Sequence, residues 1–435
     1  MEKRYWSLSF LAAGFLILGF ISTYTQYFSW FGLVPLFTIL LSPKSSTRDV
    51  ILSSLFAGLL YYGAFFSWLI YYSWLTYVPL VLVLTPSLLI YFVPLKILFR
   101  KIASSGVQIV LCVFWYFSLC TAFSFTPLGA IPYELPFYGS LSLQQLSSIG
   151  NSAILPSLFV LLNLCIAQCI KNKNFTSIIR IFLTLLLFIG IFFWGQKELQ
   201  TTYKKNISVA LVQHNLPVGK EWRLQNENKI KETYTQLALE AAQKNPAIII
   251  FPLYTFPEDI YKNPEFFTQL AQQTGSYILL GSHIPSGKKF FDGALLYSPE
   301  GKLSGTYQAV QAPPFRSLNE TTETQYQLLE TPFGKIGVLL CYEDSQSRIA
   351  QNALETGADF ILALSNPGHF KDTLLPQKHL YQDQLRAIET GRFVIRVSPN
   401  GPTAIINPKG KLKSQTFANQ KTIIYGQIGK GRVRS

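Results

Sequence analysis

Charged residues are scarce in this sequence. Asp, Glu, Lys and Arg together make up 14% of its 435 residues, and the mean hydropathy is +0.25. A chain this apolar is not expected to form one soluble domain, and it is too long to be a single membrane span. We therefore expect two or more structural units. The long hydrophobic runs lie in residues 1–196, whereas residues 197–435 have the composition of a soluble domain.

Cysteine is also rare, which excludes a scaffold held together by disulfides. Four of the five cysteines lie in apolar runs, where small buried cysteines are usually inert: Cys112, Cys120, Cys165 and Cys169. Cys341 stands alone in the second half and has no cysteine there to pair with. A lone thiol in such a domain is expected to be either buried or functional.

The first half contains about seven apolar segments, several of them near the ~20 residues needed to cross a bilayer. They cover residues 6–26, 28–43, 50–74, 77–96, 108–126, 153–170 and 179–195. The first is not expected to be a cleaved signal peptide, because it lacks a small-residue cleavage site and continues into more apolar sequence. The aromatic stretch 126–150 fits a re-entrant segment and an ordinary loop equally well.

Basic residues occupy alternate loops of this half. Lys3 and Arg4 precede the first segment, and further Lys and Arg residues follow the second, fourth and sixth segments, whereas the loops after the first, third and fifth have none. Since basic loops stay in the cytoplasm, seven spans would place residues 197–435 in the periplasm of a bacterium, with the protein in the inner membrane. The net charge of +14 therefore reflects membrane topology in large part, and we expect no nucleic-acid partner.

Residues 197–435 alternate short apolar strands with amphipathic helices. The strand-like runs are ISVALVQHN, AIIIFP, YILLGS, GALLYSP, IGVLL, FILALSN, FVIRVSP and TAIINP. Helices are expected over residues 219–244 and over the runs RIAQNALETGA and HLYQDQLRAIETGR, of which the last meets a stop signal at Gly391. This alternation predicts an α/β sandwich with the sheets inside and the helices outside.

Six blocks of this half occur in a characteristic order: LVQHNLPVGKEW, IIIFPLYTFP, GTYQAVQAPPF, GVLLCYED, LALSNPGHF and HLYQDQLRAIETGRFVIRVSPNGPTAIINPKG. Together with the multi-span first half, they resemble the bacterial apolipoprotein N-acyltransferases of the nitrilase, or carbon-nitrogen hydrolase, superfamily. The resemblance implies a polytopic helical membrane domain followed by a nitrilase-like αββα sandwich. It also implies phospholipid-dependent N-acylation, in which a cysteine takes an acyl chain as a thioester. The chain then passes to the amino group of a diacylglyceryl cysteine on a lipoprotein, with no cofactor and no metal.

The family uses a Glu-Lys-Cys triad, of which this sequence keeps one member. Cys341 matches the nucleophile, and its neighbours Tyr342 and Glu343 also match the family pattern. Leu253 stands in the place of the catalytic glutamate, and Ala309 stands in the place of the lysine. Loss of a general base typically lowers a rate by about 10²–10⁴-fold, so the ordinary mechanism of the family is not expected to operate.

Other residues could replace the lost groups. His369 stands on a loop that the family places near the nucleophile, where it could form a thiolate–imidazolium couple with Cys341. Arg316 could replace the charge of the lysine. Nothing in the sequence directs three weaker candidates at the thiol: His214, His283 and Glu258.

Two functions remain open. The chain could be an acyltransferase that acts on phospholipid and diacylglyceryl lipoproteins through altered chemistry. It could instead be an inactive relative that binds lipoprotein or phospholipid at the membrane, alone or with an active paralogue. In either case the resemblance implies substrate contacts by Trp222, Tyr342, Glu343 and Arg316. An amidase acting on a small carbon-nitrogen substrate is disfavoured, because it would need the same lost base and lysine.

Overall fold

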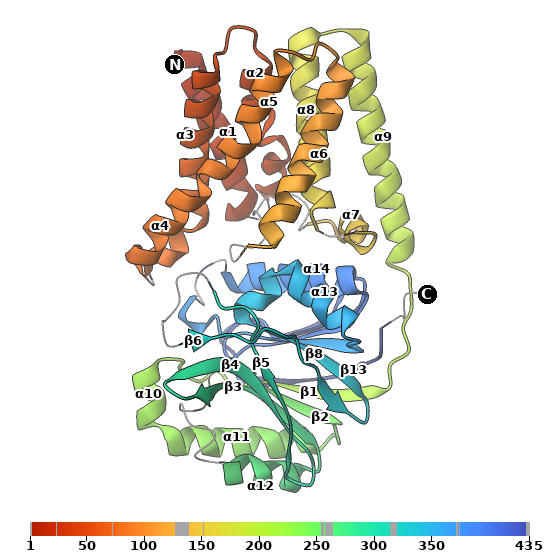
Figure 1. Cartoon of the computed structure of the whole chain (residues 1–435). Helices are drawn as coiled ribbons and strands as arrows, with labels where there is room; N and C mark the ends of the chain where they lie inside the picture. Colours follow the sequence, from red (N-terminus) through yellow and green to blue (C-terminus); the bar gives the residue numbers. More distant parts are fainter. Residues whose placement is uncertain are drawn as a thin grey trace. The chain divides into compact units, whose positions relative to one another are not determined.

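The chain forms two compact units in this computed structural model (Figure 1). One unit is Met1–Phe123 with Ala130–Glu198, and the other is Ser124–Gly129 with Leu199–Ser435. The structure describes residues 2–22, 24–71, 73–126, 139–150, 152–253, 256, 264–313, 320–370, 373 and 375–431, without the side chains of Tyr71 and His369.

The first unit is helical throughout its described residues. Its elements are α1 (Lys3–Ile21), η1 (Gln26–Phe31), α2 (Val34–Leu41), α3 (Thr47–Phe65), η2 (Ser67–Tyr71), α4 (Trp74–Leu84), α5 (Pro86–Phe99), α6 (Ser105–Ser124), α7 (Leu141–Gln144), η4 (Gln145–Ser148), α8 (Ile154–Asn172) and α9 (Phe175–Glu198). All seven expected apolar segments therefore contain helix.

Five helical stretches among the described residues are long and apolar enough to cross a membrane. They are Lys3–Ile21, Trp74–Phe99, Ser105–Ser124, Ile154–Asn172 and Phe175–Glu198. The other two expected spans differ for local reasons. The helix α2 has only 8 residues, and α3 begins with Arg48 and Asp49 in its first turn.

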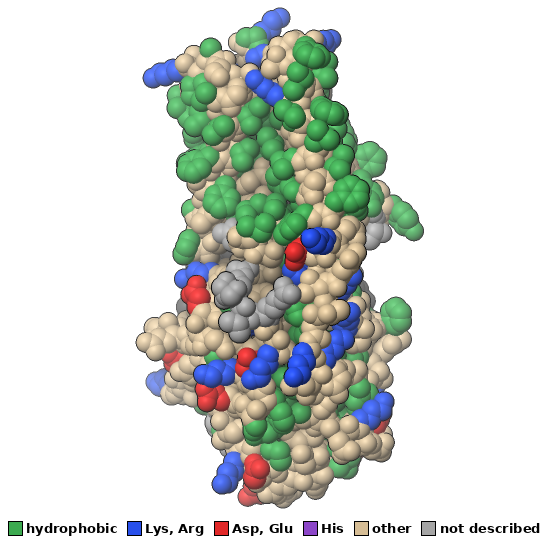
Figure 2. All heavy atoms as spheres, turned by 90° about the vertical axis from the view of Figure 1, so that its right-hand side faces the viewer, with side chains coloured by type: hydrophobic (Ala, Val, Ile, Leu, Met, Phe, Trp, Pro, Cys, Tyr) green, Lys and Arg blue, Asp and Glu red, His purple; other side chains and the backbone are tan. Residues whose placement is uncertain are grey.

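Large apolar side chains cover the outside of the helical unit, and Lys and Arg side chains gather at one end of it (Figure 2). On α9, Phe182, Leu183 and Phe193 are 59%, 57% and 67% exposed. Soluble proteins rarely expose apolar surface on this scale, whereas the interior of a bilayer solvates it. The unit is thus the polytopic helical domain of an integral membrane protein, as the sequence predicts.

The second unit contains two β-sheets in its described residues. The order in one sheet is β13-β1-β2-β3-β4-β5, with β6 beside β4, and the order in the other is β12-β11-β10-β9-β8-β7. The strands of the first sheet are β1 (Ile207–Gln213), β2 (Ile248–Leu253), β3 (Tyr277–Ser286), β4 (Lys289–Tyr297), β5 (Leu303–Gln308), β6 (Glu320–Thr321) and β13 (Thr422–Ile428). Those of the second are β7 (Leu329–Thr331), β8 (Gly334–Leu340), β9 (Phe360–Leu364), β10 (Val394–Val397), β11 (Ala404–Ile406) and β12 (Leu412–Gln415).

Helices cover the outer face of each sheet. The first sheet packs on α11 (Glu227–Ala242) and α12 (Pro264–Thr274), and the second packs on α13 (Ser347–Glu355) and α14 (Leu375–Thr390). Between the sheets lies an inner core to which both contribute, for example Leu279 of β3 and Val338 of β8. Because side chains alternate along a strand, Ile278 and Leu280 face the helices instead. This is the expected αββα sandwich.

Some elements differ from the expectation. The helix expected over 219–244 is two helices, α10 (Lys220–Gln225) and α11, which are separated at Asn226. The helix α12 was not expected. The strands β5, β6, β7, β12 and β13 were not expected either, because half-exposed residues weaken their apolar pattern. The helix α14 does end before Gly391, whose φ of +64° suits glycine.

The carboxyl ends of parallel strands meet at one edge of the sandwich. The strands β1, β2 and β3 run parallel, as do β8, β9 and β10. The side-chain amide of Asn366, which follows β9, donates a hydrogen bond of 3.2 Å to the carbonyl oxygen of Leu253 at the end of β2. In open α/β sheets, ligands bind outside such strand ends, so we expect a functional site at this edge.

Candidate functional site

Cys341 lies at a sharp turn where a buried strand ends. The strand β8 stops at Leu340, and the 3₁₀ helix η6 (Cys341–Ser345) begins at once. Cys341 has a φ of +48°, the left-handed region that costs a residue with a side chain roughly 1–2 kcal/mol. Its side chain is half-buried and packs against the inner core. Residues held in sparsely populated conformations cluster at active sites, so this geometry suits a nucleophile. The 3₁₀ helix that begins at the cysteine has 5 residues.

Glu343 holds this turn in place from within the protein. Its side chain is fully buried, and its carboxylate accepts hydrogen bonds from Tyr307 Oη at 2.9 and 3.1 Å and from the backbone N–H groups of Val310, Gln311 and Leu340 at 2.8, 3.2 and 2.9 Å. Burial raises the pKa of Glu343 to about 8 against the opposing effect of these hydrogen bonds. The hydrogen bonds that the structure gives this carboxylate come from its own chain, and substrate binding by Glu343 stays a prediction. The carboxylate of Glu343 holds the turn at Cys341 in place.

The two residues expected to stand in the places of the family's glutamate and lysine are buried and apolar. Leu253 is 0% exposed and Ala309 is 3% exposed, and both belong to the inner core against which Cys341 packs. Leu253 also covers Gly281 of the neighbouring strand, where an added Cβ would lie 2.4 Å from Leu253 Cδ1. The fold thus brings the three expected triad positions to one core, where the side chains of Leu253 and Ala309 supply neither an acid nor a base.

The other expected contact residues have different surroundings. Trp222 of α10 is half-buried and packs against the outer core of the first sheet, which is shared with α11 and α12. Tyr342 is half-buried, burial raises its pKa, and its carbonyl oxygen accepts a 2.7 Å hydrogen bond from Ser345 Oγ. Substrate binding by Trp222 and Tyr342 stays a prediction.

The proposed replacements for the triad can be placed only in part. Arg316 and Glu258 lie outside the described residues. His369 belongs to the short helix η7 (Gly368–Phe370), in a loop that Asn366 links to Leu253, and its side chain lies outside the described part of the structure. His214 is buried, burial lowers its pKa to about 3, and its Nδ1 accepts a hydrogen bond from the backbone N–H of Leu216. It is a neutral structural residue.

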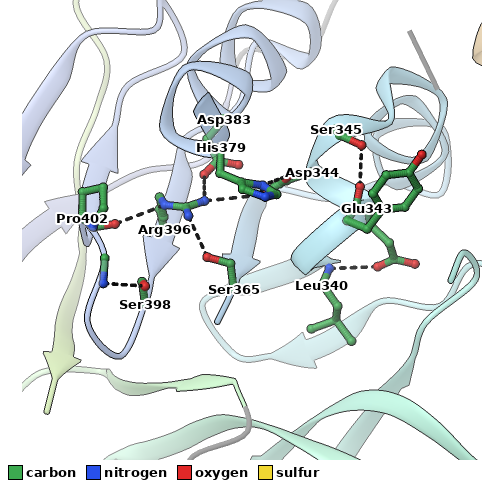
Figure 3. Close-up of polar contacts among 12 residues, drawn as sticks. Leu340, Glu343, Asp344, Ser345, Ser365, His379, Asp383, Arg396, Ser398 and Pro402 are labelled. Carbon is green, nitrogen blue, oxygen red and sulfur yellow. Dashed lines mark hydrogen bonds and ion pairs between the residues drawn. The ribbon is translucent and has the colours of Figure 1, made fainter. Parts of the chain in front are cut away.

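A buried network of charged side chains includes Asp344 of η6 and adjoins the turn at Cys341 (Figure 3). The carboxylate of Asp344 lies 2.7 Å from His379 Nδ1 and 3.3 Å from Arg396 Nη1. Arg396 also donates to Asp383 and to Ser365 Oγ, both at 2.7 Å. Burial raises the pKa of Asp383, Arg396 opposes this effect, and the nearby Asp344 adds to it. The network ties η6 to α14 and β10, which fixes the back of the site.

Sequence reasoning missed this network. Two signals in the sequence point toward it. Asp344 belongs to the same CYED run as the nucleophile, and His379 and Asp383 stand four residues apart on one helix, where they share a face. Arg396 gives no such signal, because it interrupts an otherwise apolar strand. Among the described residues, no group of three or more His, Cys, Asp and Glu side chains could hold a metal ion.

Comparison with known proteins gives consistent results over the second unit and part of the first. A family model described as carbon-nitrogen hydrolase matches residues 208–435. The apolipoprotein N-acyltransferase of Synechocystis sp. is 27% identical over 313 residues, which are 64% of this chain and 60% of the relative. That of Geobacter metallireducens is 22% identical over 349 residues, 73% of this chain and 66% of the relative. The chain thus spans about three fifths to two thirds of these two relatives.

Solved structures are also similar to about half of the chain. The crystal structure of a carbon-nitrogen hydrolase from Helicobacter pylori G27 is 16% identical, with a TM-score of 0.44, and the match covers 51% of this chain and 89% of that chain. The resemblance to bacterial apolipoprotein N-acyltransferases that the sequence motifs indicate is confirmed by the curated relatives.

Proposed function

Because the chain belongs to the carbon-nitrogen hydrolase family, we propose that it is a membrane-bound acyltransferase related to the apolipoprotein N-acyltransferases, with Cys341 as its nucleophile. In this proposal the acyl donor is a membrane phospholipid, and the acceptor is the amino group of the diacylglyceryl cysteine at the N-terminus of a lipoprotein. The helical unit lies in the inner membrane of a bacterium, and the sandwich lies in the periplasm. The basic loops of the helical unit support this orientation.

The observation that carries the proposal is the conformation of Cys341. A residue other than glycine keeps a φ of +48° only where its surroundings enforce it, and here the buried carboxylate of Glu343 does so through its bond to Leu340. A cysteine without a function has no reason to occupy a strained turn, since glycine would fit there without strain. Retention of both the turn and the thiol therefore supports a nucleophile.

The chemistry takes two balanced steps. The thiolate of Cys341 attacks the carbonyl carbon of the phospholipid ester, the carbon–oxygen bond breaks, and the lysophospholipid alcohol leaves with a proton. The amino group then attacks the thioester, the carbon–sulfur bond breaks, and the amine proton returns to the thiol. A free cysteine has a pKa near 8.5, so a few per cent of it is thiolate at pH 7 before any help from neighbours.

The test is direct detection of the thioester. The full-length protein in detergent is incubated with phosphatidylethanolamine, and intact mass spectrometry measures the adduct. We expect the mass of one acyl chain, its absence in Cys341→Ala, and its release when a synthetic diacylated lipopeptide with a free amino terminus is added. Cys169→Ala is the matched control, since Cys169 is also half-buried but lies in α8. It should leave the adduct unchanged.

A second function is favoured by the side chains at the other triad positions. Leu253 and Ala309 are buried and apolar, which suits a non-catalytic relative that binds phospholipid or lipoprotein while an active paralogue does the chemistry. In that case the protein would bind the diacylated lipopeptide and form no adduct under conditions in which a homologue with the complete triad is acylated. This outcome would contradict the proposed acyltransferase.

A further inference from the structure

A histidine and an aspartate lie side by side next to the positions where the triad has been lost. The strands β3 and β4 pair in antiparallel register, and His283 of β3 lies opposite Asp292 of β4. The backbone N–H of Ala309 donates a hydrogen bond of 2.8 Å to the carbonyl oxygen of Asp292. His283, Asp292 and Ala309 therefore form one row across the first sheet.

The alternation of side chains places this row on the inner face. Leu279, two residues before Gly281 and four before His283, belongs to the inner core, as does Ala294, two residues after Asp292. Residues of the opposite parity, Ile284 and Leu295, belong to the outer core. Because side chains of a strand alternate with period two, His283 and Asp292 share the face of Leu279 and Ala294. That is also the face of Leu253 and Ala309.

Both lost triad positions border the pair. Leu253 lies opposite Gly281, which is two residues before His283 and thus roughly 7 Å away along the strand. Ala309 lies one strand away from Asp292 on the other side. The histidine and the aspartate therefore stand in the part of the sheet between the place of the family's glutamate and the place of its lysine.

The two side chains lie within ion-pair distance of one another. His283 Nδ1 lies 3.2 Å from Asp292 Oδ1, the histidine side chain is 23% exposed, and the aspartate side chain is 5% exposed. The ring of Phe290 packs against the imidazole with a centroid distance of 4.3 Å. A carboxylate at Nδ1 selects the tautomer and the orientation of an imidazole, and proton transfer then occurs at Nε2.

We infer that His283 and Asp292 form a replacement acid–base dyad for Cys341, in which His283 is the general base and Asp292 positions it. This inference rests on the proposed function and assigns the proton transfers that the lost glutamate performs in the family. His283 Nε2 takes the proton from the Cys341 thiol as the carbon–sulfur bond forms, and it returns the proton to the alcohol oxygen that leaves the ester. In the second step it takes a proton from the attacking amine, and the departing thiolate receives it.

A purely structural role for the pair predicts different behaviour. A buried carboxylate needs a partner. If His283 did no more than provide that partner for Asp292, its removal would change stability but not the ionisation of the Cys341 thiol. Among the described residues, the strand β4 beside His283 carries the acidic residue Asp292, and β6, which pairs with β4 at Phe290, carries Glu320. The test must therefore read the ionisation of the thiol itself.

The experiment uses the full-length protein in detergent and two measurements. One is the rate of acylation of Cys341 by phosphatidylethanolamine, and the other is the rate of its alkylation by iodoacetamide from pH 5 to pH 10, located on Cys341 by peptide mass spectrometry. For His283→Gln we expect acylation to slow by about 10²–10⁴-fold and the alkylation profile to move to higher pH. Asp292→Asn should change both in the same direction by a smaller factor. Added imidazole should partly restore acylation in His283→Ala.

The control is Ser286→Ala, a substitution of an exposed residue at the end of the same strand, which should leave both profiles unchanged. If His283→Gln is acylated and alkylated as the unsubstituted protein is, the dyad is wrong and the proposed acyltransferase can still hold. If the unsubstituted protein forms no adduct but its alkylation profile depends on His283, the dyad stands and the proposed function fails. A variant that unfolds is replaced by His283→Ala with imidazole, and absence of rescue in folded protein overturns the inference.

Discussion

The backbone N–H of Leu340 donates a hydrogen bond of 2.9 Å to the carboxylate of Glu343, so the residues on the two sides of Cys341 are tied together. The same carboxylate binds Tyr307 of β5 and the backbone just beyond Ala309. One buried acid thereby joins the turn at Cys341 to the segment just beyond Ala309.

Replacement of Glu343 by glutamine should destabilise the sandwich. The amide N–H groups would then face some of the donors from which the carboxylate now accepts hydrogen bonds. This should lower the free energy of unfolding by about 1–3 kcal/mol. For a unit of this size that corresponds to a fall of roughly 2–10 °C in the unfolding midpoint, which thermal scanning in detergent measures. An unchanged midpoint would show that the carboxylate does not hold the turn.

The same variant should change how stability depends on pH. Burial raises the pKa of Glu343 from its ordinary 4.5 to about 8, so the folded state holds this proton more tightly than the unfolded chain does. The resulting stabilisation is complete below pH about 4.5 and is lost as pH rises through about 8. We expect the unfolding midpoint of the unsubstituted protein to fall more steeply than that of Glu343→Gln between pH 5 and pH 8. Asp383, whose pKa is also raised, adds a slope of the same sign in both proteins.

Cys341→Gly should be more stable than Cys341→Ala. Glycine adopts the φ of +48° without strain, and the relief exceeds its extra entropy in the unfolded chain, for a net gain of about 1 kcal/mol. Cys169 provides the matched control, because it lies inside α8, where glycine should be the less stable of the two by about 1 kcal/mol. The two midpoint differences should therefore have opposite signs.

Gly281→Ala should disturb the place of the lost glutamate. The added Cβ would lie 2.4 Å from Leu253 Cδ1 and 2.8 Å from Leu253 Cα, so the end of β2 must shift. Overpacking of this kind costs about 1–3 kcal/mol, and the unfolding midpoint should fall accordingly. Gly219→Ala is the control, since an added Cβ there meets nothing within 4 Å, and its midpoint should not change.

The substitutions Leu253→Glu and Ala309→Lys, which introduce the family residues, should provide another way to remove the proton of the Cys341 thiol. Leu253→Glu alone places a carboxylate in an apolar core and should lower stability, whereas Leu253→Glu with Ala309→Lys supplies a partner and recovers part of the loss. When this pair is introduced into His283→Gln, acylation of Cys341 by phosphatidylethanolamine should rise above that of His283→Gln. Failure of the pair to do so in folded protein would mean that Leu253 and Ala309 do not border the reacting thiol.

Much of the architecture follows from the sequence because it depends on local patterns. Apolar runs predict the helical membrane unit, and alternation of strands and helices predicts the layers of the sandwich. The block GVLLCYED puts Cys341 at the end of a strand, and the PLYTFP and TYQAV segments show that Leu253 and Ala309 stand where an acid and a base are expected. Each of these conclusions needs only neighbouring residues.

Only the tertiary structure decided which distant segments of the chain lie next to each other. The last described strand, β13, pairs with the first strand of the sandwich, β1, and Arg396 joins Asp344 to Asp383. The sequence separates His283 from Asp292 by a turn and from Ala309 by a further strand, and it does not show which face each occupies. Strand register decides that, because a shift of one residue moves every side chain to the opposite face. The register is stabilised by the packing of whole sheets, which no single motif contains.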